Sequence, residues 1–203
     1  MSARYAKGAT LASEIQARLA ALARAHDLTR PSLPGVESKQ TPTTVRALIE
    51  AILAPYLDNR HQRLSVTGPD AEIQEQSVTS LALVLYELAT NAVKCGAFSV
   101  RTGSVHIDLS VASGKFELQW KERGGPEVPK TPDHQGFGTN LIRRIVSDQF
   151  AGEAFFDWNP EGLIFRLTAP SGRVISVATA HLDVASTANA NGPASCRPTP
   201  HTG

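Results

Sequence analysis

Hydrophobic and polar residues recur with two different periods along the chain, and these periods divide it into helices and strands. Apolar residues spaced three or four positions apart predict helices over residues 9–28, 42–57, 73–94 and about 139–151. Alternating apolar and polar residues predict strands over residues 63–67, 105–111, 116–120, 154–158 and 163–169. The last four strands form two hairpins, so we predict an α/β two-layer sandwich: a mixed, mostly antiparallel sheet with helices on one face.

The helix ending at Gly96 carries an unusual set of polar side chains beside its apolar face. Glu87, Asn91 and Lys94 lie at positions i, i+4 and i+7, so they share one stripe of the helix. Asparagine and glutamate offer oxygen atoms to Mg²⁺, and lysine offers positive charge to phosphate. The stripe is therefore either a site for a metal ion and a polyphosphate or an ordinary solvated face.

A second candidate position follows from the alternation in the strand at 116–120. Phe116, Leu118 and Trp120 face one side, and Glu122 continues the same series. A carboxylate on a core face is unfavourable unless a partner satisfies it, and an amine such as the exocyclic amino group of adenine would do so. The alternative is that the strand ends at Lys121 and that Glu122 turns to solvent.

Glycines mark the remaining candidate segment. The loop over residues 123–135 is rich in glycine and proline, which suits a cover over a site. Gly136-Phe137-Gly138-Thr139 then leads into a helix, where backbone N–H groups and the helix dipole could approach phosphate. A single Gly-x-Gly is a weak signal, because glycines also begin helices for packing reasons.

Composition limits the function classes without selecting one. The formal net charge is +1, which gives no indication of nucleic acid or an anionic membrane as a partner. The two cysteines, Cys95 and Cys196, form neither a disulfide framework nor a metal cluster. No apolar run reaches membrane-spanning length and no signal peptide is evident, so a cytoplasmic location is expected.

We expect four parts along the chain. Residues 1–30 form a partial dimerisation helix, residues 31–40 a linker, residues 41–170 the main domain and residues 171–203 a disordered tail. In the first helix, the apolar stripe consists of Leu11, Ile15, Leu19, Leu22 and either Ala25 or His26, with Arg18 and Arg24 on the other side. One such helix must pack on its own domain, on a second copy or on a partner, so residues 9–28 could support a homodimer.

Several segments together resemble a known family. Glu87-Leu-Ala-Thr-Asn91-Ala-Val-Lys94 resembles the N box of the GHKL ATP-binding (Bergerat) fold. Trp120-Lys-Glu122-Arg-Gly-Gly125-Pro resembles the first glycine box of the HWE subfamily of bacterial sensor histidine kinases, and Gly136-Phe-Gly-Thr139-Asn-Leu resembles the second. Pro160-Glu-Gly-Leu163 also fits, and residues 19–28 are similar to the second helix of the family's dimerisation hairpin. The resemblance covers roughly residues 15–170.

The resemblance implies a nucleotide site in an ATP-dependent kinase of a two-component phosphorelay. Asn91 would bind Mg²⁺ that bridges the ATP phosphates, Glu87 would act as general base toward the attacking histidine, and Lys94 would contact phosphate. Glu122 would read the adenine amino group. The glycine boxes would supply the lid and the phosphate contacts, through Gly124, Gly125, Gly136, Phe137, Gly138 and Thr139.

The sequence departs from the family pattern in three places. Tyr86 stands where the subfamily carries a histidine, and Cys95 stands where an aromatic residue is common. The phosphoacceptor motif, which is similar to His-Arg-Val-Lys-Asn, is not found, and neither His26 nor His61 has its context. We therefore expect transfer to a histidine on another chain, such as a kinase hairpin, with a response regulator as a further partner. The alternatives are a non-catalytic nucleotide- or partner-binding regulator and a Ser/Thr kinase of the same fold, against which the Trp-x-Glu pattern argues.

Overall fold

The computed structural model describes residues 2–29, 42–57, 63–127 and 136–176 of the chain. The four α-helices are α1 (Ser2–Thr29), α2 (Val45–Leu53), α3 (Glu75–Lys94) and α4 (Phe137–Phe150). The strands are β1 (Leu64–Thr67), β2 (Ser104–Ala112), β3 (Lys115–Arg123), β4 (Glu153–Asn159) and β5 (Gly162–Pro170). Short 3₁₀ turns lie at η1 (Ala54–Tyr56), η2 (Ala97–Ser99) and η3 (Ser171–Arg173). Each predicted helix and strand is thus present, with ends shifted by a few residues except at α1, which begins seven residues before its predicted start.

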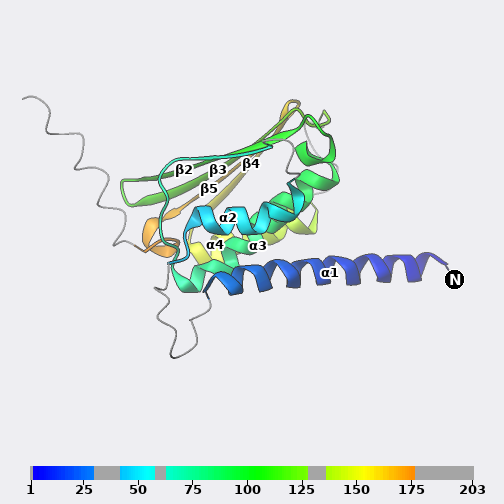
Figure 1. The fold of residues 1–203 in the computed structure, drawn as a ribbon, viewed down its shortest axis with the longest axis horizontal. Helices are drawn as coiled ribbons and strands as arrows, with labels where there is room; N and C mark the ends of the chain where they lie inside the picture. Colours follow the sequence, from blue (N-terminus) through cyan, green and yellow to red (C-terminus); the bar gives the residue numbers. More distant parts are fainter. Residues whose placement is uncertain (1, 30–41, 58–62, 128–135, 177–203) are drawn as a thin grey trace, which may run out of the picture.

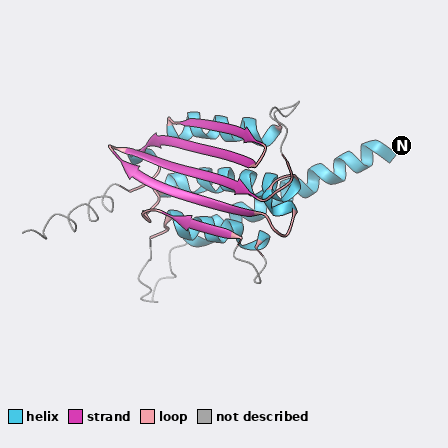
Figure 2. Ribbon diagram, turned by 90° about the horizontal axis from the view of Figure 1, so that it is seen from above, coloured by secondary structure: helices cyan, strands magenta, loops and turns pink. Residues whose placement is uncertain are grey.

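The strands form one sheet of five in the order β1-β2-β3-β5-β4. Only β1 and β2 are parallel, and the other neighbours are antiparallel. Helices α2, α3 and α4 cover one face of this sheet, and the opposite face carries no described helix (Figures 1 and 2). The predicted two-layer arrangement is confirmed, because every hairpin strand alternates between the helical layer and the open face.

The core lies between the sheet and the helical layer, with α3 at its centre. The apolar face of α3 is completely buried at Leu81, Leu85 and Leu88. Trp120 and Phe165, which pair on neighbouring strands, are equally buried and belong to the same core cluster as this face. Burying a large apolar side chain contributes about 1.5–3 kcal/mol, so packing in this core fixes the position of the polar stripe on α3.

Helix α1 lies on the outer side of the helical layer, against α2 and α3 (Figure 1). Its contact face consists of Ala21 and Ala25, which are buried, and the chain beyond it is tied back where Thr43 Oγ1 donates to the Leu28 carbonyl at 2.9 Å. The predicted apolar stripe is wrong as a packing face at Ile15 and Leu19, which are 47% and 60% exposed, whereas Ala25 at its end is buried. Of the three expected modes of packing, the structure shows α1 on its own domain.

The main domain extends past its predicted end at residue 170. Val174 and Ile175 are fully buried, and Ile175 pairs with Ile73 in an isolated bridge. The Ser176 amide donates to the Glu72 carbonyl at 2.8 Å. The prediction of a tail from residue 171 is therefore wrong for residues 171–176, while residues 177–203 and the predicted linker at 31–40 lie outside the described part of the chain. Within that part, none of the helices has the length and apolar content needed to cross a membrane.

Candidate active site

The polar stripe of α3 passes from the protein interior toward solvent. Glu87 is only 3% exposed, Asn91 is half-buried, and Lys94 at the end of the helix is exposed. Because Glu87 is a buried carboxylate, the simple alternative of a fully solvated stripe is wrong for this position. The stripe therefore contains one interior acid followed by two increasingly accessible polar groups.

The start of α4 meets this stripe at Glu87. Gly136 occupies the N-cap position, with φ −64° and ψ 164°, and Thr139 is buried in the first turn. A Cβ atom added to Gly138 would lie 2.5 Å from Glu87 Oε2, so only glycine allows the carboxylate to come this close. Gly136 has no side chain with which to cap the helix, which suits the binding of an anion at this N-terminus. Two segments that are separate in the sequence thus converge as predicted.

Glu122 lies inside β3, opposite Val105 of β2, and is 4% exposed. The alternative in which it turns to solvent is therefore wrong. The Ala97 amide donates to Oε2 at 2.7 Å, and Trp120 Nε1 donates to Oε1 at 3.2 Å. Burial raises the pKa of the Glu122 carboxyl, and these two hydrogen bonds partly offset that effect. The Trp-x-Glu spacing has a physical reason, since residues two apart on a strand share a face.

Glycines allow the backbone to pack closely around Glu122. A Cβ atom on Gly96 would lie 2.1 Å from Glu122 Oε2, and one on Gly125 would lie 2.9 Å from Ala97 Cα. Gly124 has φ +67°, in the left-handed region that favours glycine, and it turns the chain out of β3 toward the predicted lid. Residues 128–135 of that lid lie outside the described part of the chain.

Arg18 of α1, which the helical period places opposite the predicted apolar stripe, completes the Glu87 end of the site. Arg18 Nε lies 2.6 Å from Glu87 Oε1, and its guanidinium lies 5.1 Å from the centre of the Phe137 ring. Phe137 is otherwise 69% exposed. Arg18 therefore links α1 to Glu87 and to the start of α4. Arg18 could not be identified as a site residue from the sequence, because this requires knowing which face of α1 packs on the domain.

The residues around Glu87 and the residues around Glu122 form two clusters at opposite ends of the second half of α3. With a rise of about 1.5 Å per residue, Gly96 lies roughly 13 Å beyond Glu87 along the helix, with Asn91 between them. One end joins a buried acid to a glycine-rich helix start, and the other presents a buried carboxylate of raised pKa. Such a surface suits an elongated ligand with an anionic end and an end that donates hydrogen bonds.

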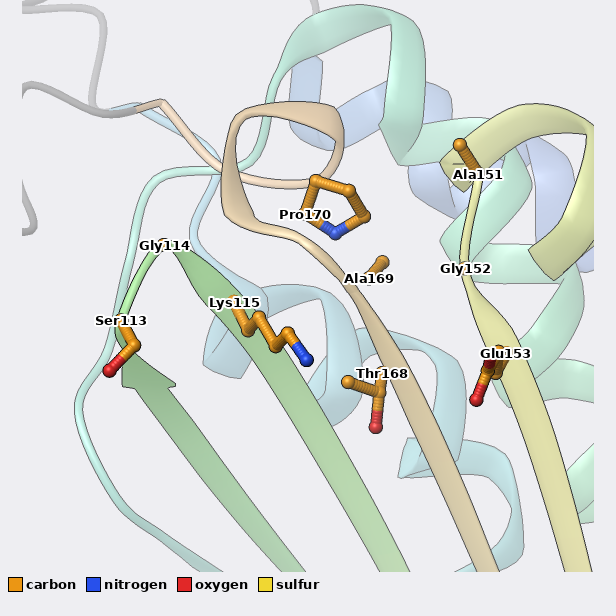
Figure 3. Close-up of a pocket in the computed structure, with 9 residues that line it drawn as sticks. All are labelled: Ser113, Gly114, Lys115, Ala151, Gly152, Glu153, Thr168, Ala169 and Pro170. Atoms are coloured by element: carbon orange, nitrogen blue, oxygen red, sulfur yellow. The ribbon is translucent and has the colours of Figure 1, made fainter.

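A pocket elsewhere in the fold does not overlap with this site. It lies between the β2–β3 turn, the chain entering β4 and the end of β5, with Lys115, Glu153 and Thr168 among its lining residues (Figure 3). Lys115 begins β3 and Glu122 lies near its end, so the pocket is roughly 23 Å from Glu122 along the strand. None of the predicted site residues lines it.

Replacing Gly96 with alanine is expected to destabilise the fold by about 1–3 kcal/mol. The added methyl group would collide with the Glu122 carboxylate, which two hydrogen bonds hold in place, and would lie 2.9 Å from Ala92 Cα. Urea denaturation measures the change. Gly136→Ala is the matched control, since its Cβ would meet nothing within 4 Å. Equal losses in the two variants would contradict the close packing at Gly96.

Comparisons with known proteins find similarity to histidine kinases. The model of the family described as HWE histidine kinase matches residues 1–70. A blue-light-activated histidine kinase of Brucella anthropi is 34% identical over 157 residues, 75% of this chain and 30% of that protein. Blue-light-activated histidine kinase 1 of Erythrobacter litoralis is 36% identical over 161 residues, 78% of this chain and 43% of that protein. The chain thus spans less than half the length of these curated relatives.

Solved structures support the same assignment at the level of the fold. The structure matches the histidine kinase domain of a blue-light activated histidine kinase from Erythrobacter litoralis with a TM-score of 0.54 and 18% sequence identity. The match covers 78% of this chain and 75% of that one. The chain therefore matches the HWE histidine kinase family over residues 1–70, and its described part has the GHKL fold of histidine kinase catalytic domains.

Proposed function

We propose that this chain binds ATP with Mg²⁺ and transfers the γ-phosphoryl group to a histidine on another chain. The observation that carries the proposal is the arrangement along α3, with Glu87 against Gly138 at one end and the buried Glu122 at the other. The similarity to histidine kinases supports it.

The adenine base would lie at the Glu122 end. Ala97 and Trp120 each donate one hydrogen bond to Glu122, and a carboxylate has further lone pairs with which to accept one from an exocyclic amino group. Gly124 and Gly125 would let the lid begin next to the base. The phosphates would lie toward Gly136, Phe137, Gly138 and Thr139 at the start of α4, with Lys94 as a source of positive charge.

The donor chemistry of the site fits a magnesium ion. Asn91 offers a carboxamide oxygen on a half-buried position, and oxygen is the ligand atom that Mg²⁺ prefers. The described residues contain no cluster of three or more His, Cys, Asp or Glu side chains that could hold a metal ion by themselves. This is the pattern expected for a cation held by one or two side chains together with substrate phosphates. The ion would neutralise charge on the phosphates during transfer.

In this proposal Glu87 acts as general base. Arg18 holds Oε1, so Oε2 is the oxygen that faces Gly138 and the proposed phosphate end. In the transfer step the acceptor imidazole nitrogen would form a bond to the γ-phosphorus while the bond to the β–γ bridging oxygen breaks and ADP leaves. Glu87 would take the proton that the imidazole releases.

The acceptor histidine would come from a second molecule. His26 lies on α1 about two helical turns after Arg18, roughly 12 Å along the axis. Its side chain is exposed, whereas Arg18 contacts Glu87. His61 lies outside the described residues. We propose the histidine-containing hairpin of a related kinase as the acceptor and a response regulator as the next partner. The exposed Ile15 and Leu19 leave an apolar face on α1 for a homodimer or for that hairpin.

Incubation with γ-labelled ATP and the isolated hairpin of a related full-length kinase tests the proposal. We expect acid-labile label on the hairpin, dependent on Mg²⁺ and on this chain. Bound ATP without label on the hairpin would contradict catalysis, and acid-stable label on serine or threonine would indicate a different phosphotransferase.

A non-catalytic regulator is the second candidate, and two observations favour it. Arg18 occupies one oxygen of Glu87 at 2.6 Å, and the buried Tyr86 stands where the HWE pattern has a histidine. Such a protein would bind nucleotide, a response regulator or a kinase hairpin and act by occupancy. It would bind ATP in the labelling experiment without transferring phosphate.

The affinity for ATP is expected to weaken when the pH falls through the raised pKa of Glu122. Only the ionised carboxylate can accept from the adenine amine with either oxygen, and burial moves its protonation to a higher pH than that of an ordinary glutamate. The stability of the fold changes in the opposite direction, because the folded state binds this proton more tightly than the unfolded state. Protonation of Glu122 at low pH therefore does not destabilise the fold, so weaker ATP binding at low pH would not result from unfolding caused by this group.

Calorimetric titration with ATP at several pH values below neutral measures the effect. Glu122→Gln should bind ATP more weakly at neutral pH and should lose the pH dependence. The exposed Glu161→Gln variant is the matched control, since Glu161 pairs only at the surface with Arg123. An identical pH profile in the wild-type protein and in Glu122→Gln would show that Glu122 does not read the base.

A further inference from the structure

Arg63 directs its hydrogen bonds to one short loop. It directly precedes β1, and its Nε donates to the Gly103 carbonyl at 2.9 Å. Its Nη2 donates to the carbonyls of Ala97 and Val100 at 3.1 and 2.6 Å. The buried Phe98 ring lies 5.1 Å from the guanidinium carbon. The planar fork of an arginine is well suited to fixing several carbonyl groups at once.

Ala97 connects this loop to the candidate base site. Its carbonyl oxygen accepts from Arg63, while its amide donates to Glu122 Oε2 at 2.7 Å. A Cβ atom on Gly103 would lie 1.8 Å from the Ala97 carbonyl oxygen, so the loop is packed tightly from a second side. The orientation of the Glu122 carboxylate therefore depends on a backbone amide whose own position Arg63 holds.

We propose that Arg63 is a positioning residue for base recognition, which acts through Ala97 to hold Glu122 ready for an exocyclic amino group. The inference rests on the proposed function, in which Glu122 receives the adenine base. A site built to hydrogen-bond a substrate N–H rejects analogues that lack it, provided that the acceptor is fixed in advance. Arg63 supplies this fixation without touching the nucleotide.

Arg46 offers a matched control for a purely structural role. Its Nη1 donates to the Val66 carbonyl at 2.8 Å and its Nη2 to the Gly68 carbonyl at 3.2 Å. It thus ties down the chain at the opposite end of β1, and these hydrogen bonds reach neither Ala97 nor Glu122. Both arginines should contribute to stability, but only Arg63 should contribute to the choice of base.

The experiment compares the affinities of the wild-type chain, Arg63→Gln and Arg46→Gln for ATP and for purine riboside triphosphate, which lacks the amino group. We expect the wild-type chain and Arg46→Gln to share the same preference for ATP. In Arg63→Gln the preference should fall by about tenfold, the factor that one hydrogen bond of ordinary strength supplies. Arg63→Lys, which keeps a donor in reach of the loop, should retain part of it and provides a second variant if Arg63→Gln does not fold.

The two levels of the proposal fail in different ways. An unchanged preference in folded Arg63→Gln or Arg63→Lys, beside a clear preference in the wild-type chain, would overturn the role of Arg63 and leave ATP binding at Glu122 intact. A wild-type chain that binds both nucleotides equally would overturn the reading of the amino group itself, and the role of Arg63 with it.

Discussion

Replacing Glu87 with glutamine is expected to slow phosphoryl transfer to a hairpin histidine by about 10²- to 10⁴-fold, the usual contribution of a general base. Glutamine retains the size of the side chain and can still accept from Arg18, but it cannot take a proton from the acceptor imidazole. ATP should bind at least as tightly, because the change removes a negative charge from the phosphate end of the site. Single-turnover labelling measures the transfer rate and calorimetry the affinity.

The control for this prediction lies on the same helix. Glu75 is exposed in the first turn of α3, so Glu75→Gln makes the same chemical change away from Gly138 and Arg18. It should leave both the transfer rate and the affinity unchanged. A Glu87→Gln variant that transfers phosphate at the wild-type rate would assign Glu87 to a structural ion pair with Arg18 instead of to catalysis.

The features predicted best from the sequence are those that a single period defines. The alternation in β3 placed Glu122 on the same face as Trp120, and the structure confirms that both are buried. The helical period placed Glu87, Asn91 and Lys94 on one stripe of α3. The glycine segments could be located from their residue type, and glycine is needed where the chain packs closely, as Gly138 does against the Glu87 side chain.

The packing of α1 shows where this reasoning fails. Of the predicted apolar stripe, the large residues Ile15 and Leu19 are exposed, and the structure instead buries Ala25 at its end together with Ala21, which the prediction left out. Size favoured the large residues, but small residues let α1 approach α3 closely. With the packing face wrong, Arg18 could not be connected with Glu87 or Phe137.

The donors around Glu122 could not be predicted for a different reason. The Ala97 hydrogen bond comes from a backbone amide, which every residue except proline possesses, so the residue type carries no signal. Arg63 is likewise recognisable only after the chain folds, because its three acceptors are carbonyl groups some 34 to 40 positions away in the sequence. Such contacts are properties of the tertiary fold.

Replacing Asn91 with alanine is expected to remove Mg²⁺-dependent ATP binding and to lower transfer by about 100-fold or more, since a bound cation supplies several kcal/mol of charge stabilisation. The fold should survive the change. The amides of Cys95 and Gly96 donate to the Asn91 backbone carbonyl, at 3.0 and 3.1 Å, and not to its side chain, so these contacts at the end of α3 do not depend on the side chain. Titration with ATP in Mg²⁺ and in EDTA measures the effect.

Asn91→Asp separates loss of the ligand atom from loss of packing. Aspartate keeps an oxygen at the same distance along the side chain, so it should retain part of the Mg²⁺ dependence, whereas alanine should bind ATP equally with Mg²⁺ and with EDTA. If alanine binds Mg·ATP as tightly as the wild-type chain, Asn91 is not a metal ligand. If Asn91→Ala abolishes Mg·ATP binding while the chain keeps its biological effect, that effect does not require nucleotide. The non-catalytic regulator would then be preferred to the kinase as the proposed function.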